Sequence, residues 1–219
     1  QTTPLAKLHV TDTQDAASVQ VAVFEGYRAT PAADDEAYIS FKLSDSAGNQ
    51  DEFGRITWVA RDETSTTEDG AIEMDFLVDG TLTREFYIDR NNVLIGHNIG
   101  VSGVTGLRNV GLGDAALNSL TSGNDNLGIG SNAVGDASTA SNIVGIGKGA
   151  LSNSNANSNT AVGTDAAFSN TSGGSNVAIG TGAMKDNSTG QRNVAIGAFA
   201  ANDFDGTIGL VSIGYASLP

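Results

Sequence analysis

The stretch Asn176-Val177-Ala178-Ile179-Gly180 returns almost unchanged one repeat later as Asn193-Val194-Ala195-Ile196-Gly197. Related units recur throughout residues 92–219, and each ends in a glycine that marks its repeat. These marker glycines are Gly96, Gly113, Gly130, Gly147, Gly163, Gly180, Gly197 and Gly214. Successive markers are 17 residues apart, except for one spacing of 16 residues. A short, nearly fixed period predicts a stacked solenoid, here of about eight coils with a glycine at each turn.

Large aliphatic residues occupy the positions one and three residues before most marker glycines. This alternation is typical of a β-strand with one apolar face. We therefore predict that these side chains fill the interior of each coil. The predicted coil-core residues are Val110, Leu112, Leu127, Ile129, Val144, Ile146, Val162, Val177, Ile179, Val194, Ile196, Val211 and Ile213.

The position between the two aliphatic residues is small in every coil after the first. Uniform smallness on the other face of a strand indicates that another backbone approaches closely. We therefore predict that this face lies against a second chain. The predicted contact residues are Gly111, Gly128, Gly145, Ala161, Ala178, Ala195 and Ser212.

Two further positions repeat with the coil. Asparagine stands four residues before six of the eight markers, and Ile143 and Leu210 replace it in the other two. Stacked asparagines predict a ladder of side-chain hydrogen bonds along the solenoid. Alanine commonly stands three residues after the marker, which predicts a second short strand or turn, so that each coil would hold two strands.

Residues 1–91 predict an antiparallel, β-sandwich-like domain. Alternating apolar residues indicate strands near residues 5–10, 18–25, 38–43, 56–60, 72–78 and 82–88. Asp79-Gly80 predicts a tight hairpin turn between the last two. Trp58 lies at an alternating position and is expected in the core. Because so small a domain buries little surface, we expect a partner chain to complete its core.

Composition narrows the range of partners. The 219 residues carry a net charge of −14 and contain no cysteine. Most of the excess acid lies in residues 1–91, which hold 7 basic and 18 acidic residues. An acidic surface repels phosphate backbones, so nucleic acid is not an expected partner. No apolar run is long enough to span a bilayer, so membrane insertion is not expected. The first residue is Gln, which indicates a processed product or a fragment.

Several motifs resemble known families. The units Asn176–Gly180 and Asn193–Gly197 are similar to the head repeats of trimeric autotransporter adhesins, and residues 159–167 resemble repeats of phage tail fibres and tailspikes. The resemblance implies three chains packed as parallel β-rolls, with the small residues facing the threefold axis. Residues 5–10 and 88–96 resemble modules of phage fibres, which favours the phage family. The resemblance to phage fibres also implies a C-terminal chaperone segment that is cleaved off. The 17-residue coil is longer than the usual adhesin coil.

The resemblance predicts a structural and receptor-binding segment of a homotrimeric tail fibre, located on a virion. Expected partners are the chain itself, other tail proteins and a host cell-surface glycan or protein. The head of a bacterial surface adhesin is the alternative, and a polysaccharide depolymerase is the third reading. Because no catalytic motif or paired carboxylate pattern appears, we expect no enzyme activity, cofactor or metal. The aromatic residues Phe204 and Tyr215 are predicted receptor contacts.

Overall fold

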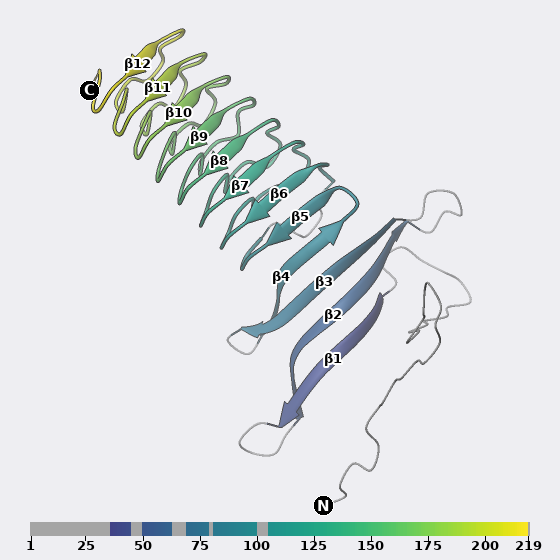
Figure 1. Ribbon diagram of the computed structural model, residues 1–219. Helices are drawn as coiled ribbons and strands as arrows, with labels where there is room; N and C mark the ends of the chain where they lie inside the picture. Colours follow the sequence, from purple (N-terminus) through teal and green to yellow (C-terminus); the bar gives the residue numbers. More distant parts are fainter. Residues whose placement is uncertain (1–35, 45–49, 63–68, 79–80, 100–104, 219) are drawn as a thin grey trace, which may run out of the picture.

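The computed structural model describes residues 36–44, 50–62, 69–78, 81–99 and 105–218. These residues form a single sheet of twelve strands, in which each strand lies beside the next one in the sequence (Figure 1). Antiparallel strands come first and a parallel solenoid follows, so the predicted all-β class is confirmed. The strands expected near residues 5–10 and 18–25 lie outside the described residues.

Strands β1 (Glu36–Ser44), β2 (Gln50–Asp62), β3 (Asp69–Val78) and β4 (Thr81–Asp89) form the antiparallel part. Strands β3 and β4 pair from Ala71↔Asp89 to Val78↔Thr81, which confirms the predicted hairpin. Its predicted turn, Asp79-Gly80, lies outside the described residues. The register shifts once within each of these three strand pairs. The described strands of this part belong to one sheet. The sandwich-like arrangement of residues 1–91 stays a prediction.

Strand β5 (Asn92–Ile95) joins the two parts, because it pairs antiparallel with β4 and parallel with β6. The carboxylate of Asp89 accepts hydrogen bonds from the backbone N–H groups of Asn91 (2.8 Å) and Asn92 (2.5 Å) at the turn. The N–H of Gly96 donates to the carbonyl of Glu85 at 2.8 Å. The solenoid therefore starts directly on the edge of the antiparallel sheet.

The solenoid adds one short strand per coil in strict parallel register, so that equivalent residues of successive coils are partners. Its strands are β6 (Asn109–Leu112), β7 (Leu127–Ile129), β8 (Val144–Ile146), β9 (Thr160–Val162), β10 (Val177–Ile179), β11 (Val194–Ile196) and β12 (Val211–Ile213). The predicted second strand is wrong for the described coils. The chain after each marker glycine folds instead as a run of turns.

The strand side chains that lie inside each solenoid coil are the opposite set from the predicted one. The small residue at the middle of each strand is buried in the chain's own coil, whereas the large residues on either side lie on the outer face. Ala178, for example, has no exposed surface, while Ile179 is 39% exposed. The buried small residues are Gly111, Gly128, Gly145, Ala161, Ala178, Ala195 and Ser212. Their assignment to a contact with another chain is therefore wrong.

The physical reason is the thinness of the coil. A Cβ atom added to Gly111 would lie 3.3 Å from Leu117 Cδ1, which belongs to the turn wall of the same coil. This wall supplies a pair of buried side chains in the coils whose markers run from Gly113 to Gly197, such as Ala116 with Leu117 and Ala183 with Met184. The close neighbour that the small residues indicated is thus the opposite wall of the same chain. No room remains inside for the predicted coil-core residues.

The marker glycines are confirmed as turn residues. All eight have φ between 123° and 139°, a region open to glycine but strained for other residues. A Cβ atom on Gly163 would lie 2.6 Å from the carbonyl carbon of Gly180, the marker of the next coil. The markers therefore stack backbone on backbone, and two independent constraints keep the position glycine.

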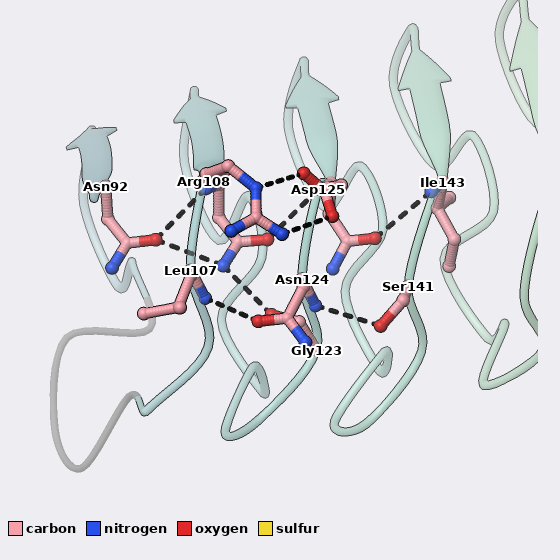
Figure 2. A network of polar contacts seen from close by, with 10 residues as sticks. Asn92, Leu107, Arg108, Gly123, Asn124, Asp125, Ser141 and Ile143 are labelled. Atoms are coloured by element: carbon pink, nitrogen blue, oxygen red, sulfur yellow. Dashed lines mark hydrogen bonds and ion pairs between the residues drawn. The ribbon is translucent and has the colours of Figure 1, made fainter.

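The asparagine ladder is also confirmed (Figure 2). Asn109 donates its backbone N–H to Asn92 Oδ1 at 3.0 Å, and its side-chain amide donates to the carbonyl of Gly123 at 3.0 Å. Where Ile143 replaces asparagine, its N–H still donates to Asn126 Oδ1 at 3.1 Å. Each side chain therefore ties two neighbouring coils together within the buried interior. Such internal bonds satisfy polar groups that burial would otherwise leave without water.

Candidate functional site

Two rows of apolar side chains cross the whole sheet on one face. The strand registers connect them without a break from β1 to β12. One row is Ile39, Ile56, Met74, Phe86, Ile95, Leu112, Ile129, Ile146, Val162, Ile179, Ile196 and Ile213. The other is Ala37, Trp58, Ile72, Ile88, Val93, Val110, Leu127, Val144, Thr160, Val177, Val194 and Val211. We call these two rows the apolar face, in which Thr160 is the one polar residue.

None of the residues of the apolar face is buried in the chain. On the solenoid, Val110 is 41% and Leu112 is 47% exposed, and Ile196 is 37% exposed. The prediction that the large residues of each strand fill the coil is therefore wrong for Val110, Leu112, Leu127, Ile129, Val144, Ile146, Val162, Val177, Ile179, Val194, Ile196, Val211 and Ile213. Contiguous apolar surface of this kind marks an interaction site in soluble proteins.

The antiparallel strands carry the same face with larger side chains. Trp58 is 43% exposed, and Ile72 beside it is 38% exposed. The prediction that Trp58 lies in the core of its own chain is therefore wrong. Phe76 and Phe41 widen the face on either side of Gly54, with which both are paired. Both phenylalanines are about half exposed. Aromatic side chains thus gather where the sheet is antiparallel.

The opposite face of the antiparallel strands holds charged side chains in ion pairs. Arg55 Nε donates to Asp75 Oδ2 at 2.8 Å, and this hydrogen bond raises the pKa of Arg55. Arg84 pairs with Glu73, which is almost fully buried. The guanidinium of Arg55 also lies 5.7 Å from the centre of the Tyr38 ring. The charges of β2–β4 that pair here are therefore kept away from the apolar face.

Ion pairs on the solenoid lie at its exposed edges. Arg108 donates to Asp125, one coil further along, through Nε at 2.5 Å and Nη2 at 2.7 Å (Figure 2). The bonds to Arg108 lower the pKa of Asp125. Lys185 Nζ lies 3.7 Å from Asp165. These pairs join neighbouring coils and leave the apolar face uncharged.

The two predicted receptor contacts lie in different surroundings. Phe204 is half-buried and packs against the coil core. Tyr215 is 79% exposed, and its ring meets that of Phe199 edge to face, with 6.2 Å between ring centres. Phe199 was not predicted. The sequence signal for a contact between Phe199 and Tyr215 is their place in the repeat. Phe199 stands two residues after the marker Gly197, and Tyr215 stands one residue after the next marker, Gly214.

Asp205 is the most strongly held carboxylate at the C-terminal end. It accepts hydrogen bonds from the hydroxyl (2.6 Å) and N–H (2.9 Å) of Ser188 and from the N–H of Thr189 (2.8 Å). The hydroxyl of Ser188, followed by the N–H of Thr189, lowers the pKa of Asp205 far below its usual value. The carboxylate thus caps the turn of the preceding coil, which is a structural role.

In the described part of the chain, no group of three or more His, Asp or Glu side chains is arranged to hold a metal ion. Nor does the same part contain a helix that is long and apolar enough to cross a membrane. What the arrangement offers is an apolar surface along a rod.

Comparison of the chain with protein-family models, with curated proteins and with solved structures found no match.

Proposed function

We propose that this chain is a structural and receptor-binding segment of a homotrimeric fibre of the phage tail-fibre or tailspike type, which attaches a virion to a host cell surface. The apolar face of the solenoid is the observation that carries the proposal. It runs along the rod, as the parallel register requires, and its side chains are too large and too exposed for a finished surface. Packing of three copies about a common axis removes this surface from water.

Burial of the apolar face supplies free energy for the association of three chains. Full burial of a Val, Leu or Ile side chain contributes about 1.5–3 kcal/mol, so a half-exposed one retains about 1 kcal/mol to be gained on association. On β6–β12 six side chains of the face are exposed, and the others are partly buried and retain less. The exposed ones are Val110, Leu112, Ile179, Ile196, Val211 and Ile213. Summed over the coils of three chains, the gain exceeds the entropic cost of association, for which estimates are about 4–15 kcal/mol.

The proposed axis differs from the one that the resemblance implied. The aliphatic pairs, such as Val177 with Ile179, face the neighbouring copies, while the small residues such as Ala178 stay inside each coil. Receptor contact is proposed for the exposed pair Phe199 and Tyr215 at the end of the solenoid. The proposed location is the virion.

A bacterial surface adhesin is the second candidate. It is favoured by the units Asn176–Gly180 and Asn193–Gly197, which fold here as the register-matched strands β10 and β11 with their marker glycines. A coiled-coil stalk and membrane anchor encoded downstream would select the adhesin. A tail-assembly gene cluster would select the fibre.

The experiment is a mass measurement by light scattering on the wild-type chain and on Ile179→Asp, with Ile179→Val as the matched control. We expect a trimer for the wild type and for Ile179→Val. The aspartate variant should dissociate at a concentration about 100-fold higher or more, because burying an unpaired carboxylate is strongly unfavourable. A wild-type chain that stays monomeric at micromolar concentration contradicts the proposal.

A further inference from the structure

We propose that the antiparallel strands β1–β4 bind second copies of the chain through the aromatic end of the apolar face. This inference rests on the proposed fibre but goes beyond it. A solenoid trimer can form while three antiparallel sheets remain apart, each exposed to solvent. The structure assigns them a joint core instead, built from the same face of each copy.

The apolar face is continuous across the junction between the antiparallel strands and the solenoid. In the antiparallel pairing of β4 and β5, Phe86 lies opposite Ile95 and Ile88 lies opposite Val93. The next pairing places Ile95 beside Leu112. A partner that covers the first solenoid coil therefore meets Phe86 and Ile88 as the next side chains of the same rows. Figure 1 shows β4 directly beside β5 at this junction.

The exposed side chains on the apolar face of the antiparallel strands include large aromatic rings. Trp58 and Phe76 are 43% and 49% exposed, although a large aromatic ring gains more from burial than an aliphatic side chain. Large aromatic side chains lie more often in the interior of a folded chain than on its surface. Here the opposite face of β2–β4 is occupied by Glu73, Asp75 and the arginines that pair with them. Trp58 and Phe76 remain on the apolar face.

The length and spacing of the apolar face fit another copy of the chain as its occupant. Twelve strands at ~4.8 Å spacing give a face of roughly 50 Å, along which apolar side chains recur at every strand. A partner must present apolar groups at that spacing over that length. The same face of a second copy does so, and about a common axis each copy meets its neighbours at equal height. An anionic lipid surface is disfavoured by the net charge of −14.

The test uses Trp58, because it is the only tryptophan in the 219-residue chain. Acrylamide quenching and the emission maximum are measured on the assembled wild type, on Ile179→Asp and on the chain unfolded in guanidinium. We expect the assembled wild type to show a blue-shifted maximum and quenching several-fold weaker than the unfolded chain. The Ile179→Asp monomer should show quenching close to that of an exposed tryptophan.

A second variant tests the antiparallel part by itself. Ile72→Asp introduces a charge beside Trp58, and Tyr38→Asp places the same charge on the opposite face of the sheet, where Tyr38 is 56% exposed. We expect Ile72→Asp to keep the trimer and the β-sheet circular dichroism but to make Trp58 several-fold easier to quench. Tyr38→Asp should leave the quenching unchanged.

The outcomes separate this inference from the proposed function. A wild-type trimer whose Trp58 is quenched as readily as in the Ile179→Asp monomer overturns the joint core and leaves the fibre standing. An equal effect of Ile72→Asp and Tyr38→Asp on quenching also overturns it. A monomeric wild type overturns both proposals.

Discussion

The antiparallel strands β2–β4 and the solenoid strands β6–β12 expose the same kind of apolar face but fill their opposite face differently. Across the middle row of the sheet, Thr57, Glu73 and Tyr87 are buried in the antiparallel part. The equivalent residues of the solenoid are Gly, Ala or Ser, which its own turns cover within about 4 Å. The antiparallel part thus relies on paired long side chains, whereas the solenoid relies on close backbone approach.

The two parts are therefore destabilised most strongly by different kinds of substitution. In the solenoid, a single added methyl group meets backbone atoms that cannot move without disturbing the next coil. In the antiparallel part, space is less limiting, and the loss of one charged partner matters more. Three tests probe this contrast, each with a matched variant, beginning with the largest expected effect.

Gly163→Ala should destabilise the solenoid by about 3 kcal/mol or more. The added Cβ would lie 2.6 Å from a backbone carbon of Gly180, at a φ of 133°. Strained φ and overpacking each cost about 1–3 kcal/mol. Thermal unfolding followed by circular dichroism measures the loss.

Gly70→Ala is the matched control in the antiparallel part. A Cβ at Gly70 would make one ordinary contact, 3.6 Å from the carbonyl of Val59. We expect a change within about 0.5 kcal/mol, as for most surface substitutions. If Gly163→Ala and Gly70→Ala lower the stability by the same amount, the proposed contrast between the two parts is wrong.

Arg84→Met should destabilise the antiparallel strands by up to about 3 kcal/mol, because it leaves the buried carboxylate of Glu73 without its arginine. The effect stays below that of a fully buried pair, since the Arg84 side chain is 25% exposed. Hydrogen exchange should show faster opening of β2–β4, with β9–β11 unchanged. Arg84→Lys, which keeps the charge, should lose less stability than Arg84→Met; an equal loss argues against the ion pair.

The smallest effect concerns pH at the C-terminal coils. Because the folded state lowers the pKa of Asp205, its carboxylate contributes stability above the unfolded pKa of about 3.9. That contribution is lost as the pH falls through the lower folded pKa. Hydrogen exchange at Ser188 and Thr189 should therefore accelerate, relative to the other turns, in acid. In Asp205→Asn this acid-dependent step should be absent, and its persistence would assign the step to another group.

Much of the fold was predictable, because the repeat and the hydrophobic alternation are strong local signals. The marker glycines, the asparagine ladder and the hairpin of β3 and β4 follow from residue type and spacing. The direction of each coil face was not predictable in the same way. The pattern Val177-Ala178-Ile179 indicates two different faces, but it does not say which face lies inside.

The error has an instructive cause. Large apolar residues normally fill the interior, which predicts Val177 and Ile179 inside the coil and Ala178 at a contact with another chain. The rule fails here because the coil is too thin to hold side chains from both walls. The alternating pairs Ala116-Leu117 and Ala133-Val134 on the other wall already fill it. Summing the side-chain volumes of one coil, with these pairs included, is the sequence signal that distinguishes an interior lined by the small strand residue from one lined by the large strand residues.

Strict parallel register has an evolutionary consequence. Since each solenoid strand pairs with its neighbour at the same coil position, a duplicated or deleted block of 17 residues keeps the pairing of its flanks. Each such event changes the length of the rod by about 4.8 Å. The gene can therefore adjust reach in discrete increments by recombination between repeats. Related chains would then differ in length by whole multiples of one coil.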